Sequence, residues 1–186
     1  MILALEFSSN RRSVAIADGK DVLARVETDD VKKPPLTLID EALKKANLNH
    51  AAIETISIGI GPGSYTGIRS AIATAQGWQL ARNINLLPIP SAEILAANAA
   101  ANGQRGEIHF IIDAQRHEYY HTTWKLTEDN RSQTTPLHII TVTVAAELKA
   151  FGPDAAGFPS CEPLFPDAAI LAQLAAGRTD FQPGET

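Results

Sequence analysis

The first 27 residues alternate between apolar and polar stretches in a pattern that predicts three short antiparallel strands. The apolar runs are Ile2 to Phe7, Ser13 to Ala17 and Val22 to Glu27. Asp18-Gly19 separates the second run from the third, and glycine tolerates the positive φ that a tight hairpin turn requires. The chain therefore opens with a predicted β-meander.

Helical spacing follows after a polar segment. The next apolar residues recur every three or four positions, at Leu36, Ile39, Leu43 and Ala46. This spacing predicts an amphipathic helix that ends near Asn47. Further predicted elements are strands at 53–60, 85–89, 108–113, 119–126 and 137–142, and helices at 68–83, 91–101, 145–151 and 166–176. A meander followed by alternating strands and helices predicts an α/β fold in which helices flank a mixed β-sheet.

The polar, glycine-containing segment 102–106 is the best candidate for a boundary between two lobes. Domain boundaries commonly fall in exposed polar joints, because few contacts cross them. We therefore expect a first lobe at 1–102 and a smaller, shortened second lobe at 103–186.

The amino-acid composition and net charge of the chain argue against several classes of function. The 186 residues are 45% hydrophobic and 20% charged, which is typical of a globular protein. Cys161 is the only cysteine, which excludes an intrachain disulfide and a multi-cysteine metal site. The net charge of −5 argues against direct nucleic-acid binding, which needs clustered lysine and arginine. No apolar stretch approaches the roughly 18–20 residues of a membrane helix, so we expect a soluble, cytoplasmic protein without membrane contact.

The segment most informative about function is the nonapeptide Gly61-Pro62-Gly63-Ser64-Tyr65-Thr66-Gly67-Ile68-Arg69, between a predicted strand and a predicted helix. Its glycines permit a sharp turn and close backbone approach, and Ser64 or Thr66 can cap the helix. The free N–H groups of a helix start can hold an anion. The segment lacks the Gly-Lys-Ser/Thr of a Walker A loop and the spacing of a dinucleotide fingerprint. Two interpretations stay open: a capped structural turn, or a site for an anion or a partner.

This nonapeptide resembles the signature of the TsaB (YeaZ) family of tRNA threonylcarbamoyladenosine biosynthesis proteins. Ile2-Leu3-Ala4-Leu5-Glu6-Phe7-Ser8-Ser9 resembles the first strand and loop of that family, and Ile111-Ile112-Asp113-Ala114-Gln115-Arg116-His117-Glu118-Tyr119-Tyr120 resembles the start of its second lobe. The matches occur in the right order and cover roughly residues 1–125. The resemblance implies a two-lobed actin-like ATPase (ribonuclease H-like) fold within the glycoprotease-like M22 superfamily.

The resemblance also implies a role. Members of the family are non-catalytic scaffold subunits for threonylcarbamoyl transfer to adenosine of tRNA, so no cofactor, metal or catalytic residue is expected. Such a subunit pairs with a TsaD-like subunit, the pair recruits a TsaE-like ATPase, and tRNA is contacted only indirectly. Alone, the subunit forms a homodimer through the same surface, which corresponds here to the helices at about 36–46 and 67–82.

Two sets of residues follow from the resemblance. The expected partner interface includes Leu36, Ile39, Arg69, Ala73 and Gln76. The expected remnants of a degenerate nucleotide site are Glu6, Ser8 and Asp113.

The chain departs from the family pattern at several positions. Glu6-Phe7 stands where the family usually has Asp-Thr, and segment 32–35 replaces a His-Ser pair before the first helix. His117 replaces a glycine in the second-lobe turn, and the final strand of the family is not predicted. These differences bear on the surface that would pair with a TsaD-like subunit.

A small actin-like ATPase or kinase is one alternative function. Glu6 has the acidic character needed after the first strand, but Asp113-Ala114-Gln115-Arg116 lacks the glycine that lets backbone N–H groups approach phosphate. Phosphoryl transfer depends on positioning and electrostatics, so the loss of one phosphate loop argues against hydrolysis. Glu6 and Asp113 can also be interpreted as an acid/base pair or as solvated carboxylates at strand ends.

A zinc-dependent, glycoprotease-like peptidase is the other alternative. His117-Glu118-Tyr119-Tyr120-His121 matches the pattern H-E-x-x-H, which places two zinc ligands on one face of a helix. The neighbouring tyrosine, threonine and tryptophan residues favour a strand instead. Residues four apart in a strand are separated by about 13 Å, too far to share one zinc ion.

Two further residues of the predicted second helix have open roles. Arg69 lies in the first turn, where a cation opposes the helix dipole, so we expect it to contact either Glu6 or a partner. Trp78 can lie in the core or at an interface, and burial of aromatic residues favours the core.

Overall fold

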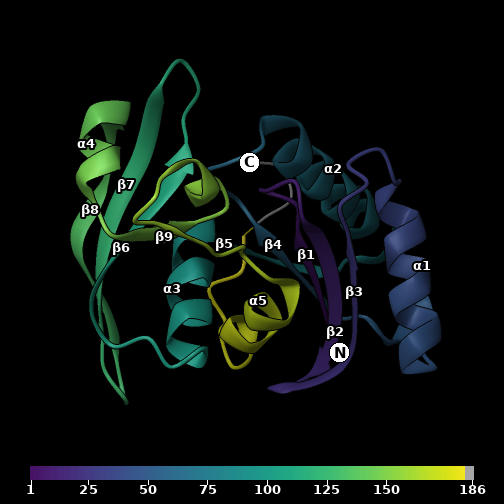
Figure 1. Ribbon diagram of the computed structural model, residues 1–186. Coiled ribbons are helices and arrows are strands. Elements are labelled where there is room, and N and C mark those ends of the chain that lie inside the picture. Colours follow the sequence, from purple (N-terminus) through teal and green to yellow (C-terminus); the bar gives the residue numbers. More distant parts are fainter. Residues whose placement is uncertain (183–186) are drawn as a thin grey trace. The chain divides into compact units, whose positions relative to one another are not determined.

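The structure is a computed structural model, and it describes residues 1–182. The chain folds into two compact units (Figure 1). The first unit consists of Met1–Ser91 together with the segment that begins at Asp167, and the second unit is Ala92–Pro166. Each unit contains one five-stranded sheet, which confirms the predicted α/β class with helices flanking the sheets.

The sheet of the first unit has the strand order β3-β2-β1-β4-β5. The first three strands are antiparallel neighbours, whereas β4 and β5 run parallel to β1, so the sheet is mixed as predicted. The hairpin between β2 and β3 turns at Gly19, whose φ is +56°. The strands are β1 (Ile2–Glu6), β2 (Arg12–Asp18), β3 (Asp21–Thr28), β4 (Thr55–Gly59) and β5 (Asn85–Ile89).

Two helices, α1 (Pro35–Ala46) and α2 (Tyr65–Arg82), pack their buried sides into the main core of this unit. Helix α1 ends as predicted at Asn47, which adopts a left-handed conformation with φ 54°. Helix α2 begins at Tyr65 rather than at the predicted Ile68. The hydroxyl of Ser64 accepts a hydrogen bond from Gly67 N at 3.3 Å and so caps the helix earlier.

The last helix, α5 (Ala168–Ala175), packs against β1 and β2 within the first unit. Its buried residues include three alanines and Leu171. Several buried strand positions outside the main core cluster are small as well, among them Ala4, Ala15 and Ser57. Small residues on both elements let the helix lie close to the sheet.

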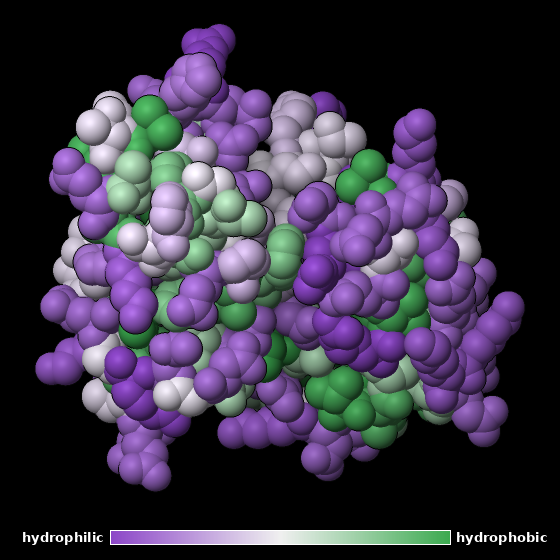
Figure 2. Space-filling view, viewed as in Figure 1, coloured by the Kyte–Doolittle hydropathy of each residue, from purple (hydrophilic) through white to green (hydrophobic). Residues whose placement is uncertain are grey.

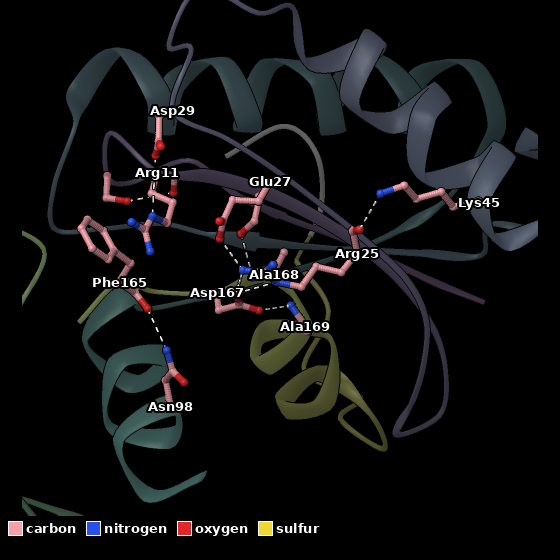
Figure 3. Close-up of polar contacts among 12 residues, drawn as sticks. Arg11, Arg25, Glu27, Asp29, Lys45, Asn98, Phe165, Asp167, Ala168 and Ala169 are labelled. Carbon is pink, nitrogen blue, oxygen red and sulfur yellow. Dashed lines mark hydrogen bonds and ion pairs between the residues drawn. The ribbon is translucent and has the colours of Figure 1, made fainter. Parts of the chain in front are cut away.

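Polar contacts hold the start of α5 on the sheet, as Figure 3 shows. Asp167 caps the helix, because its Oδ1 accepts a hydrogen bond from Ala169 N at 2.7 Å. Its other oxygen accepts one from Arg25 Nε at 2.8 Å, and Arg25 also pairs with Glu27. Ser13 Oγ in β2 accepts a hydrogen bond from Ala168 N at 2.9 Å. The chain therefore returns to its first sheet through directed hydrogen bonds and ion pairs.

The sheet of the second unit has the order β10-β9-β6-β7-β8. Helix α3 (Ser91–Ala101) contributes to a core cluster with Phe110 and Leu126, and α4 (Val142–Glu147) contributes to a second cluster with Ile111. The strands are β6 (Gly106–Asp113), β7 (Glu118–Leu126), β8 (Arg131–Thr141), β9 (Ala150–Gly152) and β10 (Glu162–Pro163). Short 3-10 turns occupy His50–Ala52 in the first unit and Ala155–Gly157 in the second.

The predicted helix at 145–151 is wrong in its position. Helix α4 ends at Glu147, and residues 150–152 form the short strand β9 beside β6. A Cβ added at Gly152 would lie 1.9 Å from the carbonyl oxygen of Ile111, so only glycine permits this close pairing. The strand predicted at 137–142 also begins earlier, at Arg131.

The packing divides the chain differently from the predicted boundary at residue 102. Helix α3 belongs to the second unit after its first residue, so the division falls at Ser91. Helix α5 belongs to the first unit, although it lies in the range expected for the second lobe. A helix with one apolar side packs on whichever sheet offers a matching surface, and the sequence of the helix does not indicate which sheet that is.

The face of the molecule drawn in Figure 2 is mainly polar. Figure 2 shows one face, on which hydrophilic side chains predominate and hydrophobic ones form small separate patches. Within residues 1–182, no helix has both the length and the apolar character that a bilayer crossing requires.

Candidate functional site

The glycine loop, residues 61–67, connects β4 to α2 and lies on the turn that follows β1. Gly61 and Gly63 have φ values of +87° and +143°, which glycine adopts without strain. Ser64 N donates a hydrogen bond to the carbonyl oxygen of Ser8 at 2.6 Å. The loop is therefore bound directly to the main chain of the segment between β1 and β2.

Two glycines allow this close approach. A Cβ added at Gly63 would lie 2.1 Å from the carbonyl oxygen of Ser8, and one at Gly67 would lie 2.0 Å from that of Phe7. Backbone atoms cannot yield as a flexible side chain can, so any other residue would push the loop away. These contacts bear out the structural interpretation of the glycines, and the role of the loop as an anion or partner site stays a prediction.

Glu6 is fully buried at the end of β1, beside the glycine loop. One carboxylate oxygen accepts a hydrogen bond from Ser8 N at 2.8 Å, and the other accepts one from Ser91 Oγ at 3.2 Å. Burial raises the pKa of Glu6, while the hydrogen bonds from Ser8 and Ser91 act in the opposite direction. The carboxylate therefore accepts hydrogen bonds from residues of its own chain.

Ser91 links Glu6 to the glycine loop. Its hydroxyl accepts a hydrogen bond from Gly61 N at 3.1 Å, and its own N–H donates to Gly61 O at 2.7 Å. On β4, Gly59 leaves room for the carboxyl group, because a Cβ there would lie 1.8 Å from Oε2 of Glu6. The end of β1, the end of β4 and the glycine loop are thus joined through one buried carboxyl group.

Arg69 points away from this buried network. Its side chain is exposed, donates a hydrogen bond to the Tyr65 hydroxyl at 3.2 Å and lies 5.2 Å from the centre of the Tyr65 ring. Within the described residues it forms no ion pair with Glu6, so that expected contact is wrong. The physical reason is that Glu6 is enclosed on the sheet, whereas Arg69 faces solvent.

The predicted partner residues divide into exposed and buried ones. Leu36 is 56% exposed, Ala73 is exposed and Gln76 is half-buried. Ile39 is fully buried in the core, so its placement at an interface is wrong. Helix α1 buries the adjacent pairs Leu38 with Ile39 and Ala42 with Leu43, which leaves Leu36 outside the core.

Sequence reasoning missed Leu80 on this surface, and it named Tyr65 only as part of the glycine loop. Tyr65 is 72% exposed and Leu80 is 88% exposed. Both share one side of α2 with three of the predicted residues, at intervals of three or four positions, and together these residues are called the α2 stripe: Tyr65, Arg69, Ala73, Gln76 and Leu80. Their helical spacing was the available signal. Trp78 lies off the stripe and packs partly against the core as expected. Its ring centre lies 5.2 Å from that of His50, and the two rings are tilted by 46°.

Asp113 ends β6 in the second unit and closes a turn. Its two carboxylate oxygens accept hydrogen bonds from Gln115 N at 2.7 Å and from Gln115 Nε2 at 2.9 Å. The next residues, Gln115, Arg116 and His117, all adopt positive φ, at 68°, 57° and 64°. Side chains other than glycine are uncommon in this conformation, so the turn has kept the backbone of a glycine-rich loop without its glycines.

The H-E-x-x-H residues lie in a strand, as predicted. Glu118 to His121 belong to β7, and His117 precedes it. Sequence reasoning missed a row of three histidines across neighbouring strands, in which His121 lies 3.2 Å from His109 and 3.4 Å from His138 between ring nitrogens. Burial, together with the charges of these two neighbours, lowers the pKa of His121 to about 4. Among residues 1–182, no set of three or more His, Cys, Asp or Glu side chains is arranged to hold a metal ion.

The chain is similar in sequence to proteins of a known family. The family model described as "TsaD: tRNA N6-adenosine threonylcarbamoyltransferase" matches residues 33–159. The TsaB protein of Haemophilus influenzae, described as a tRNA threonylcarbamoyladenosine biosynthesis protein, is 30% identical over 121 residues, which cover 64% of this chain and 51% of that protein. The TsaB protein of Escherichia coli is 25% identical over 130 residues, with 69% and 56% coverage. This chain spans about half the length of the curated relatives it matches.

Solved structures agree on the fold. YeaZ from Pseudomonas aeruginosa superimposes with a TM-score of 0.84 at 22% identity, covering 99% of this chain and 95% of that one. A second crystal structure, of a Pseudomonas aeruginosa protein with similarity to peptidase YEAZ, gives 0.83 at 24% identity with the same coverage. The family match over more than half of the chain, the curated relatives and the shared fold agree. The chain belongs to the family described as tRNA N6-adenosine threonylcarbamoyltransferase, and it is similar to the TsaB proteins among its curated relatives.

Proposed function

We propose that this protein acts in the formation of threonylcarbamoyladenosine on tRNA, as a TsaB-type scaffold subunit that binds a TsaD-type partner. The observation that carries this proposal is the α2 stripe, which presents Tyr65 and Leu80 to solvent on one side of a well-packed helix. Large exposed apolar side chains arranged in a row are typical of a protein interface. The names of the curated relatives support the pathway.

The hydrogen-bonded carboxylates of Glu6 and Asp113 support a role without catalysis. Both oxygens of Glu6 accept hydrogen bonds from Ser8 and Ser91, and the side chain has no exposed area. Both oxygens of Asp113 accept hydrogen bonds from Gln115. To bind magnesium and phosphate, either carboxylate would have to give up these contacts. We therefore propose that the chain is an inactive relative that provides a binding surface within a transferase complex.

The partners follow from the surface and the charge. A TsaD-type subunit is proposed to cover the α2 stripe together with Leu36, and a second copy of this chain is proposed to cover it when that subunit is absent. The net charge of −5 supports indirect contact with tRNA, held by a partner. A TsaE-like ATPase would join the pair, and the assembly would work in the cytoplasm.

The test is a binding measurement with a matched control. Leu80→Glu places a charge at the end of the α2 stripe, and because Leu80 is 88% exposed the fold tolerates it. Loss of one buried leucine contact costs about 1.5–3 kcal/mol. Binding to the TsaD-type subunit of the same organism, measured by isothermal titration calorimetry, should therefore weaken at least about 10-fold. Leu23→Glu makes the same change on β3, where Leu23 is 44% exposed, and should leave the affinity unchanged.

Two outcomes would contradict the proposal. The first is no complex between the wild-type chain and the TsaD-type subunit at micromolar concentration. The second is equal weakening by both leucine variants, which would place the contact elsewhere. Rapid ATP hydrolysis by the isolated chain, abolished by Glu6→Gln, would favour the small actin-like ATPase instead.

A further inference from the structure

Arg12, the first residue of β2, is a buried cation without an acceptor. It is 6% exposed, and its Nε has no hydrogen-bond partner within residues 1–182. Within these residues, Nε is the guanidinium nitrogen that is both buried and without a partner. A guanidinium carries five N–H donors, and buried charges in folded proteins are ordinarily paired or hydrogen-bonded. An unsatisfied group of this kind points to a ligand.

The surroundings of Arg12 place it at one end of the main core. Its guanidinium carbon lies 5.6 Å from the centre of the Phe7 ring, a cation–π contact that occupies none of the N–H donors. Phe7 is fully buried in the cluster that also contains Leu38, in the first turn of α1, and Ala71, near the start of α2. Arg12 pairs with Thr28, the last residue of β3, so it lies at the end of the sheet from which the chain continues toward α1.

The acidic groups near this end, Asp29 and Asp30, do not form an ion pair with Arg12. Asp30 acts on Arg12 through its charge, but its carboxylate accepts a hydrogen bond from Lys32 N at 2.9 Å within its own turn. Burial lowers the pKa of Arg12 more than Asp30 raises it. Neither α1 nor α2 has an acidic residue in its first turn, and no side chain caps α1. Both helix starts thus add positive potential without a carboxylate to meet it.

We propose that Arg12 is the centre of a binding site for a small oxyanion, either a phosphate or a carboxylate. The planar guanidinium fork matches two oxygens of either group, and desolvation strengthens such a pair. The ends of α1 and α2 add favourable dipoles of the same sign. This inference does not depend on the proposed scaffold role, because it concerns a side chain outside the α2 stripe.

Thermal unfolding of the full chain tests the proposal. About 10 mM inorganic phosphate and sodium acetate are compared, each against sodium chloride of equal ionic strength. Binding at ten times the dissociation constant is expected to raise the Tm of the wild-type chain by about 3–5 °C. Arg12→Gln should abolish the shift. Arg11→Gln is the matched control, because the neighbouring Arg11 is more exposed and lies 3.6 Å from Asp29, and it should keep the shift.

The two salts distinguish the source of the oxyanion. A response to phosphate alone identifies a phosphate site, and a response to acetate as well identifies a general oxyanion site. Equal shifts in the wild-type chain and in Arg12→Gln, or no shift with either salt, would overturn the proposal.

A second measurement does not depend on how well the glutamine variant folds. In ¹⁵N nuclear magnetic resonance, the Nε–H signal of Arg12 is assigned as the one that disappears in Arg12→Lys. This signal should move and saturate as phosphate or acetate is added to the wild-type chain. A signal that stays in place through both titrations contradicts the proposal.

Discussion

Gly59→Ala tests whether Glu6 and β4 share one fully occupied space. The added Cβ would lie 1.8 Å from Oε2 of Glu6 and 2.5 Å from its Cδ, whereas ordinary contacts begin near 3.4 Å. The carboxyl group would therefore have to move by more than an ångström. Such a shift breaks its hydrogen bonds with Ser8 and Ser91, at 2.8 and 3.2 Å.

The magnitude follows from these two contacts. Leaving buried hydrogen-bonding groups unpaired costs roughly 1–3 kcal/mol each, so the loss from two contacts is about 2–6 kcal/mol. Replacing a strand glycine by alanine returns about 0.5–1 kcal/mol of backbone entropy. The net expected loss in the free energy of unfolding is about 1–5 kcal/mol.

Urea-induced unfolding, followed by circular dichroism, measures this loss, and a double-mutant cycle isolates its cause. In the background Glu6→Ala the obstacle is gone, so Gly59→Ala should cost less than about 1 kcal/mol. Gly77→Ala in α2 is the control, since nothing lies within 4 Å of its added Cβ, and it should gain about 0.5–1 kcal/mol. The reasoning fails if Gly59→Ala costs the same with and without the Glu6 side chain.

Two further predictions concern pH. Because burial raises the pKa of folded Glu6 above its usual 4.5, its contribution to stability is present below pH 4.5 and is lost as the pH rises through the raised value. Glu6→Gln has no carboxyl group to ionise. In urea titrations, the free energy of unfolding of this variant minus that of the wild-type chain should therefore increase from pH 4 to pH 8. A difference that stays constant over this range would contradict the raised pKa of Glu6. For His121, whose folded pKa is about 4 against the usual 6.5, unfolded chains gain a proton between pH 6.5 and 4 that folded chains do not. The wild-type chain should therefore lose about 2–3 kcal/mol more than His121→Gln as the pH falls from 7 to 4, and equal losses would show that the ring titrates normally.

The elements of the first unit follow largely from local patterns. The alternation before Asp18 and the hairpin glycine define the meander, and the run that ends at Asn47 defines α1. The glycine loop was placed correctly between a strand and a helix, because glycine and serine have direct local roles there. Local chemistry of this kind can be predicted without knowledge of the rest of the fold.

Long-range contacts are what the sequence did not reveal. The pairing of Arg25 with Asp167 joins residues 142 positions apart, and no local sequence pattern predicts it. The three-histidine row depends on the strand register that places His121 beside His138. Ile39 was assigned to the partner interface from the family resemblance, but α1 buries Leu38 and Ile39 together in the core.

Within the candidate site, the positions of the residues were predicted better than their contacts. Glu6 and Ser8 do lie beside the glycine loop, yet the enclosure of Glu6 depends on Gly59 and Ser91, which are distant in sequence. Arg12 gave no signal in the sequence, because an arginine that starts a strand is ordinarily solvated. Only the packing of Phe7 beneath it shows that the guanidinium is enclosed.

The return of α5 to the first sheet has a consequence for how this chain is made. A ribosome releases residues 92–166 before it releases the helix that covers β1 and β2, so the second unit can fold while the first is still incomplete. In this sense the second unit is an insertion within the first. A fragment that stops near residue 102 would leave the small side chains of that sheet face in water, and the two ends of the chain must be expressed together to give a stable first unit.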